Sequence, residues 1–221
     1  MLTSATLKFL KNLKKNNNKP WFDVHRSEYE DAKNDFEHFI QAVINRHAKN
    51  DSDLKELIAK KCMFRINRDI RFSKDKSPYK TNFGASMDKG GKKSGLAGYY
   101  FHLEPAKSFL GGGLWMPQPE ALKKVRQEID YCYHEFQKIM SVKKFKVVFG
   151  ELYTGEGVQL AKVPQGFEKE NPAAPFLKFK SWLVISDIKD ADLTAKNLVS
   201  RTVEAFSLMQ PFIKFLNRPL D

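Results

Sequence analysis

Cysteine is scarce in this sequence, which contains only Cys62 and Cys132 among 221 residues. Neither belongs to a CxxC or mixed Cys/His pattern of the kind that binds zinc or forms a redox pair. His25, His38 and His47 also lack the paired spacing of metal ligands. The sequence therefore predicts no metal site and indicates a reduced, cytoplasmic protein.

Long hydrophobic runs are also missing. No window approaches eighteen consecutive apolar residues, and the segment MLTSATLKFLKNLKK has neither a long apolar core nor a small-residue cleavage site. We expect no membrane span and no secretion signal. Because no Pro/Gly/Ser-rich linker and no internal repeat divides the chain, we predict a single domain over residues 1–221.

Several catalytic signatures are absent, among them GxSxG, HExxH and GxGxxG. The glycine-rich segment 90–95, GGKKSG, does not have the GxxxxGK[ST] spacing of a phosphate-binding loop, and we expect a strand after it. Sites built from arginine, histidine and carboxylates need no local signature, so the sequence leaves open whether the protein is an enzyme. It indicates no particular cofactor or oligomeric state.

Positive charge is abundant. Lysine and arginine number 38 against 26 aspartate and glutamate residues, which gives a formal net charge of +12. With 42% hydrophobic and 13% aromatic residues, the chain can form a packed core. The composition predicts a globular basic protein that favours anionic partners.

Apolar periodicity predicts helices and strands in turn. Helical spacing indicates helices over residues 4–15, 21–49, 51–58, 117–139 and 192–216, the last kinked or broken near Pro211. Alternation indicates strands over residues 62–67, 83–88, 96–104 and 177–184, with a tight corner at 111–113 and mostly loops over 150–171. This order predicts an α+β fold, a mainly antiparallel sheet in the middle of the chain with amphipathic helices packed on it.

A basic loop is predicted after the first strand. Three arginines recur at every third position and three lysines follow them, whereas only Asp69 and Asp75 oppose this charge. Crowded guanidinium groups suit the oxygens of phosphate or carboxylate. The predicted ligand-binding residues are Arg65, Asn67, Arg68, Arg71, Lys74, Lys76, Tyr79, Lys80 and Tyr100. The alternative is that Asp69 and Asp75 pair with their neighbours and only tie the loop down.

The strand predicted over 96–104 places Tyr100, His102 and Glu104 on one face. If the apolar faces of the strands share the core, this face brings the three residues near Arg65 and Asn67. A histidine beside a carboxylate can transfer protons, so His102, Glu104 and Asp69 are candidate catalytic residues. The same row could equally form a cross-strand hydrogen-bond ladder, which we favour because no nucleophile is evident.

Three segments carry a resemblance to a known family. They are FLKNLKKNNNKPWFDVHRSEYE, FRINRDIRFSKDKSPYKTNFGA and GYYFHLEPAKSFLGGGLW. The chain resembles, over nearly its whole length, the uncharacterised bacterial and fungal family named domain of unknown function 2461. The resemblance implies a common core that contains these segments, with the basic loop in its most distinctive part. The family has no assigned activity, cofactor or catalytic residue, so it implies none here.

Two further functions remain open. Nucleic-acid binding would use the net charge together with Phe72, Tyr79, Tyr99 and Tyr100 as stacking surfaces, although no helix-turn-helix, zinc-finger, RRM or KH signature is present. A structural or interaction role would use the loop's ion pairs only to stabilise the fold. The leading hypothesis is a soluble domain that binds a small phosphate- or carboxylate-bearing molecule through residues 65–80.

Overall fold

The computed structural model describes residues 1–221 and has an α+β fold, as predicted. Four antiparallel strands form one sheet in the order β1-β2-β3-β4. The strands are β1 (Phe83–Asp88), β2 (Gly98–Leu103), β3 (Ser108–Leu114) and β4 (Trp182–Ile188). The helices before the sheet are α1 (Ser4–Lys15), α2 (Lys19–Val24), α3 (Arg26–His47), a 3₁₀ turn η1 (Ser52–Leu54) and α4 (Ala59–Cys62). The later helices are α5 (Pro119–Tyr131), α6 (Tyr133–Ser141), α7 (Lys143–Phe149), α8 (Ala174–Leu177), α9 (Asp190–Leu193) and α10 (Leu198–Asn217).

Contacts divide the chain into two compact units, and the prediction of a single domain stays a prediction. The first unit comprises Met1–Met87, Tyr100–Leu110 and Asp187–Glu204. The second comprises Asp88–Tyr99, Gly111–Ser186 and Ala205–Asp221.

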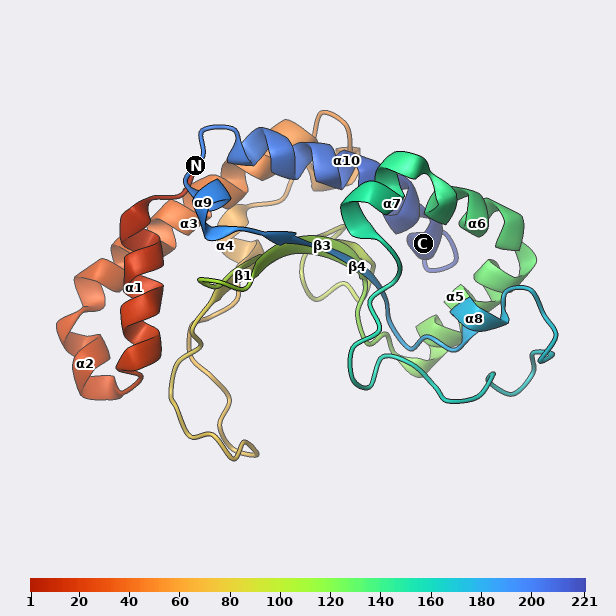
Figure 1. The fold of residues 1–221 in the computed structure, drawn as a ribbon, viewed down its shortest axis with the longest axis horizontal. Coiled ribbons are helices and arrows are strands. Elements are labelled where there is room, and N and C mark those ends of the chain that lie inside the picture. The colour runs from red at the N-terminus through yellow and green to blue at the C-terminus, as the bar shows by residue number, and fades with distance from the viewer. The chain divides into compact units, whose positions relative to one another are not determined.

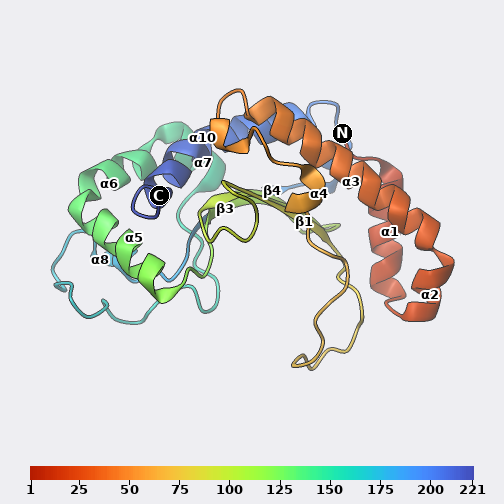
Figure 2. The ribbon, with the colours of Figure 1, turned by 180° about the vertical axis from the view of Figure 1, so that it is seen from behind.

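The core of the first unit is aromatic. Helices α1 and α3 lie side by side, with α2 at one end of the pair (Figures 1 and 2). Phe36 and Phe39 of α3 pack on Phe101 of β2, and Phe36 also stacks on Phe83 of β1 at 5.6 Å between ring centroids. Helix α3 therefore covers one face of this part of the sheet and leaves Gly84, Tyr100 and His102 on the other.

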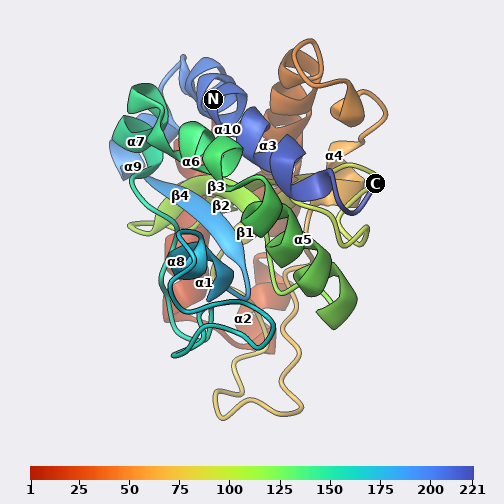
Figure 3. The ribbon, with the colours of Figure 1, turned by 90° about the vertical axis from the view of Figure 1, so that its right-hand side faces the viewer.

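In the second unit, α6 and α7 pack against the C-terminal part of α10 (Figure 3). Phe136 of α6 lies 5.2 Å from Phe215 and 6.2 Å from Phe212 between ring centroids. The three glycines 111–113 lie inside β3, not in the tight corner that we predicted. A Cβ atom on Gly113 would come within 1.9 Å of the Trp182 carbonyl oxygen, so the glycines allow β4 to approach closely.

Three predicted helices differ from the structure in where they break. The helix predicted over 21–49 is interrupted at His25, whose ring Nδ1 lies 2.8 Å from the Trp21 carbonyl oxygen and whose ring stacks on Trp21. The helix predicted over 117–139 breaks at Cys132, where the backbone leaves helical geometry. Helix α10 continues through Pro211, so the break predicted there does not occur, whereas the alternative of a kink stays a prediction.

Two strand predictions were also wrong. Residues 62–67 form the end of α4 and two isolated antiparallel bridges, Met63 to Ala85 and Asn67 to Tyr79. The alternation fails because Cys62 and Met63 are both buried while the Phe64 side chain is exposed. The last strand begins at Trp182 rather than at 177, because α8 occupies residues 174–177.

Candidate functional site

Residues 65–80 form a loop in the structure, as predicted. The loop comes just before β1 in the chain and projects from the start of that strand (Figure 1). Its two arms meet through the Asn67 to Tyr79 bridge. The Arg68 amide donates to the Pro78 carbonyl at 3.0 Å, and the Lys80 amide donates to the Ile66 carbonyl at 2.8 Å. These bonds flank Tyr79, so its own amide and carbonyl point away from the opposite arm.

Asn17 fixes the base of the loop to the connection between α1 and α2. Its side-chain amide donates to the Tyr79 carbonyl at 2.8 Å, and its side-chain oxygen accepts from the Tyr79 amide at 3.1 Å. The Tyr79 ring is buried and stacks on Phe22 with 4.0 Å between ring centroids. Tyr79 is thus an anchor of the loop, and its ring is covered by the fold.

Arg68 braces the interior of the loop. Its guanidinium forms an ion pair with Asp75 and donates to the Ser77 carbonyl and the Ser73 hydroxyl, both at 3.3 Å. Asp75 also accepts from the Ser77 hydroxyl at 2.6 Å and the Ser77 amide at 2.9 Å. The bonds from Ser77, followed by the Arg68 pair, lower the pKa of Asp75 to about 2. Asp75 therefore remains ionised at neutral pH.

Arg71 and Asp69 form a second pair at the tip of the loop. The Arg71 guanidinium donates to both carboxylate oxygens, at 2.9 Å and 2.6 Å, and this bond lowers the pKa of Asp69. Asp69 makes no contact with His102, so the structure does not bring these two candidate catalytic residues together. Beside the pair, the Phe72 side chain is 95% exposed, and the Arg71 guanidinium lies 5.8 Å from its ring centroid.

Part of the loop's positive charge is not paired with carboxylate. Arg65 and Lys74 are exposed and form no ion pair. The Lys76 amine donates to the Ile70 carbonyl at 3.0 Å. Lys80 does not belong to this exposed set, because it is half-buried at the base of the loop, with its amine 5.5 Å from the centroid of the Phe64 ring. Both acidic residues of the loop are already used by Arg68 and Arg71, so a net positive charge remains on its surface.

The second candidate cluster is the row Tyr100, His102 and Glu104 on and just after β2. The Tyr100 hydroxyl lies 3.2 Å from Nδ1 of His102, and Nε2 of His102 lies 3.4 Å from a Glu104 oxygen. Because a carboxylate only accepts, Nε2 carries the hydrogen, and the Tyr100 hydroxyl donates to Nδ1 of the neutral ring. The imidazole also stacks on Phe109 with 4.7 Å between ring centroids.

Burial shifts two pKa values in this row. It raises the pKa of Tyr100 to about 12, so the phenol stays protonated. It also lowers the pKa of His102, although Glu104 opposes this shift. A neutral histidine with a carboxylate on one nitrogen and a hydroxyl on the other can relay a proton along the row. The same bonds also satisfy both ring nitrogens, as a purely structural role requires, but they run along β2 and do not form the cross-strand ladder that we favoured.

The base of the loop reaches this row, but through residues other than those we predicted. No hydrogen bond or ion pair joins Arg65 or Asn67 to Tyr100, His102 or Glu104. Phe64 instead packs its ring edge on Tyr100 at 6.3 Å between ring centroids.

Two contacts with Glu104 extend the row. The Thr81 hydroxyl donates to a Glu104 oxygen at 3.4 Å, and the Lys14 amine lies 3.5 Å from the same oxygen. Sequence reasoning missed Lys14 and Asn17, which lie far from the loop in the sequence and carry no motif.

The remaining structural findings concern metals and membranes. No group of three or more histidine, cysteine, aspartate or glutamate side chains is arranged to hold a metal ion. None of the helices combines the length and apolar character needed to span a bilayer.

Comparison with known families bears on the whole chain. The family model described as "Conserved hypothetical protein (DUF2461)" matches residues 5–215. The chain belongs to this family. The match confirms the resemblance seen in the three sequence segments, and it covers the basic loop and the Tyr100 row of this DUF2461 protein. No curated protein and no solved structure matches the chain.

Proposed function

We propose that this DUF2461 protein binds a phosphate- or carboxylate-bearing partner on the loop of residues 65–80. The proposal rests on which charged side chains of the loop form ion pairs with each other and which do not. Both of its carboxylates are used by Arg68 and Arg71, while Arg65 and Lys74 remain exposed without an ion pair. An anion would offset this charge and would accept hydrogen bonds from the exposed cationic groups.

The loop is also held in a defined conformation, as a recognition surface requires. Asn17 fixes its base and Arg68 braces its interior, so the exposed cations are carried on an ordered frame. A purely structural role needs only the Arg68 and Arg71 pairs and gives no reason for the additional charge. Loops held on a rigid scaffold commonly carry binding residues.

The test replaces the two exposed charges of the loop that form no ion pair. Arg65→Gln with Lys74→Gln should keep the fold and lower the affinity for pyrophosphate or citrate by about tenfold, if each charge contributes about 0.5–1 kcal/mol. The matched control is Lys143→Gln with Lys144→Gln, which removes the same charge from exposed positions on α7. Equal losses of affinity in the two double variants would show that only net charge matters and would refute the loop site.

Nucleic-acid binding is the second candidate, and Phe72 favours it. Its ring is almost fully exposed beside Arg71, whereas Tyr79 and Tyr99 are buried and offer no stacking surface. A single-stranded oligonucleotide should then bind with a steep salt dependence, and Phe72→Ala should lower its affinity by about 1–3 kcal/mol. A shallow salt dependence, or no effect of Phe72→Ala, would leave the small anionic ligand as the better interpretation.

A catalytic form of the proposal assigns proton transfer to His102, with Glu104 orienting the ring. Burial favours the neutral imidazole, which is the form that can accept a proton. His102→Gln should then leave binding of pyrophosphate or citrate unchanged, because the ring makes no contact with the loop's exposed cations. Loss of binding in this variant would place His102 in the binding site rather than in a separate catalytic step.

A further inference from the structure

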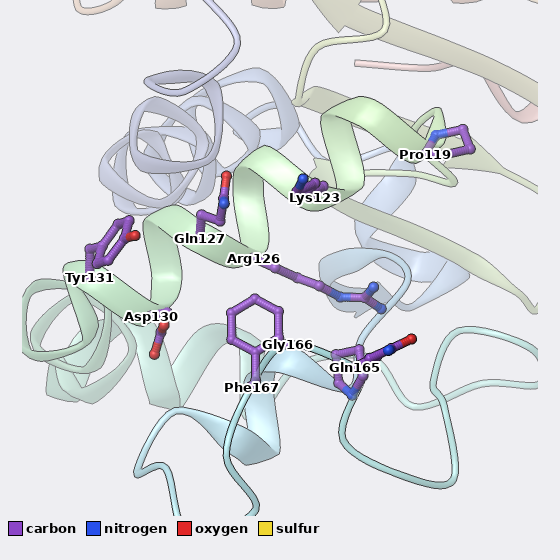
Figure 4. Close-up of a pocket in the computed structure, with 10 residues that line it drawn as sticks. Pro119, Lys123, Arg126, Gln127, Asp130, Tyr131, Gln165, Gly166 and Phe167 are labelled. Carbon is purple, nitrogen blue, oxygen red and sulfur yellow. The ribbon is translucent and has the colours of Figure 1, made fainter.

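The second unit contains a cavity that the sequence did not indicate. It has a volume of about 280 Å³ and lies between α5 and the segment that carries Gln165 and Phe167 (Figure 4). Lys123, Arg126 and Asp130 contribute to its wall from α5. This volume is close to the lower end of the range of about 300–1,000 Å³ typical of small-molecule pockets. The cavity can therefore hold a small molecule.

Arg126 is the unusual member of the lining. The residue is only 9% exposed, yet no carboxylate pairs with its guanidinium. Nη2 donates to the Phe179 carbonyl at 2.9 Å, Nε is buried without a partner, and Nη1 forms no hydrogen bond. A buried guanidinium normally has a carboxylate or several acceptors, because removing its charge from water is costly. The side chain runs from α5 toward the segment of Gln165 (Figure 4).

The neighbouring charges leave this site positive. Asp130 lies one helical turn after Arg126, but its carboxylate accepts a hydrogen bond from the Asn171 amide and makes no ion pair with Arg126. Lys123, one turn before Arg126, is exposed and forms no ion pair. Two cations and one anion therefore line the cavity, which suits a ligand with a single negative charge better than a doubly charged phosphate.

We propose that this cavity binds a small organic monocarboxylic acid. Its carboxylate accepts hydrogen bonds from the guanidinium of Arg126 at Nη1, which is not among the buried atoms, and lies near the Lys123 amine. Its carbon skeleton packs on Phe167, which lines the cavity opposite α5 in the segment of Gln165 (Figure 4). The planar fork of arginine fits a carboxylate in two-point contact, and Phe167 supplies the apolar surface. The cavity belongs to the second unit, whereas residues 65–80 belong to the first.

The test measures binding of a panel of monocarboxylates, from acetate to benzoate, to the whole chain by calorimetry and thermal shift. Benzamide serves as the neutral counterpart of benzoate. At least one acid of the panel should bind and raise Tm, while benzamide should not. Arg126→Met should weaken this binding by about 10-fold or more, as expected for a lost charged hydrogen bond. Lys123→Gln should weaken it by about 2–5-fold.

Two controls keep the test decisive. Lys124→Gln changes the neighbouring exposed lysine, which lies 4.0 Å from Glu120 and outside the cavity lining, and should leave binding unchanged. If Arg126→Met fails to fold, the contrast between Lys123→Gln and Lys124→Gln decides. Three results would overturn the proposal: no acid of the panel binds, benzamide binds as well as benzoate, or Lys123→Gln and Lys124→Gln have equal effects. The loop variants Arg65→Gln and Lys74→Gln should not alter this binding.

Discussion

The Asn17 side chain fixes the basic loop at a single residue, and its removal gives a prediction that can be measured. The Asn17 side chain forms hydrogen bonds with both the amide and the carbonyl of Tyr79. These two backbone groups point away from the opposite arm of the loop and take no part in the bonds that join the two arms. A net hydrogen bond contributes about 0.5–1.5 kcal/mol, so Asn17→Ala should lower the free energy of unfolding by about 1–3 kcal/mol. For a chain of this size, Tm should fall by about 2–4 °C for each kcal/mol.

Equilibrium urea unfolding and hydrogen exchange give two independent readouts. The Tyr79 amide should exchange faster in Asn17→Ala, by about tenfold for each 1.4 kcal/mol of lost protection. Asn16→Ala is the matched control, because the exposed Asn16 side chain donates only one hydrogen bond, to the Asn12 carbonyl. Because the Asn12 carbonyl keeps its bond from the Asn16 backbone amide, we expect Asn16→Ala to lower stability by only about 0.5 kcal/mol, the low end of the range for one hydrogen bond. Equal effects of the two variants would refute the assigned role of Asn17.

Three further predictions concern individual contacts. In Gly84→Ala the new Cβ would lie 2.4 Å from the Tyr100 hydroxyl oxygen, so the free energy of unfolding in urea should fall by about 1–3 kcal/mol. Adding Tyr100→Phe to this variant should restore stability, and a failure to restore it would show that the hydroxyl is not what the new Cβ meets. Because burial lowers the pKa of His102, the folded state disfavours its protonation, and stability should fall as pH drops below about 6.5. His102→Gln should make this dependence shallower without abolishing it, because burial also lowers the pKa of His47, and an unchanged profile would contradict the argument. Carboxyl NMR should show the pKa of Asp75 at about 2, so that its stabilising effect is lost only as pH falls from about 4 toward 2. Ser77→Ala removes the hydroxyl bond, the largest cause of this shift, and leaves the bond from the Ser77 amide, so it should raise the pKa of Asp75 part of the way toward 3.8; no change would contradict this assignment.

The fold class and the main helices could be predicted from periodicity. The helix over residues 4–15 has the predicted bounds, and the hairpin formed by β1 and β2 was also predicted. What periodicity could not predict were breaks caused by single side chains, such as His25 stacking on Trp21. These depend on tertiary contacts that a periodic pattern does not encode.

The candidate site could be predicted only in part. Charge density identified the loop, and alternation placed Tyr100 and His102 on one face. The pattern around Phe64 was misleading, because an exposed phenylalanine occupies a position expected to be buried. Arg126 was not predicted at all, since it stands in a helix rich in charged residues and resembles an ordinary surface arginine in the sequence. Its guanidinium instead donates to the Phe179 carbonyl, 53 residues later in the chain, and such a tertiary contact leaves no local signal in the sequence.

The glycine run in β3 has a consequence for how this chain folds. Glycine has low strand propensity and loses the most backbone entropy on ordering, so 111–113 have little tendency to become extended alone. Their partner, β4, begins at Trp182, which leaves a long loop to be closed before the two strands can pair. Pairing of β3 with β4 should therefore be a late event in folding. Pulse-labelling of amides during refolding should find the amides in this pair protected after those of the hairpin formed by β1 and β2.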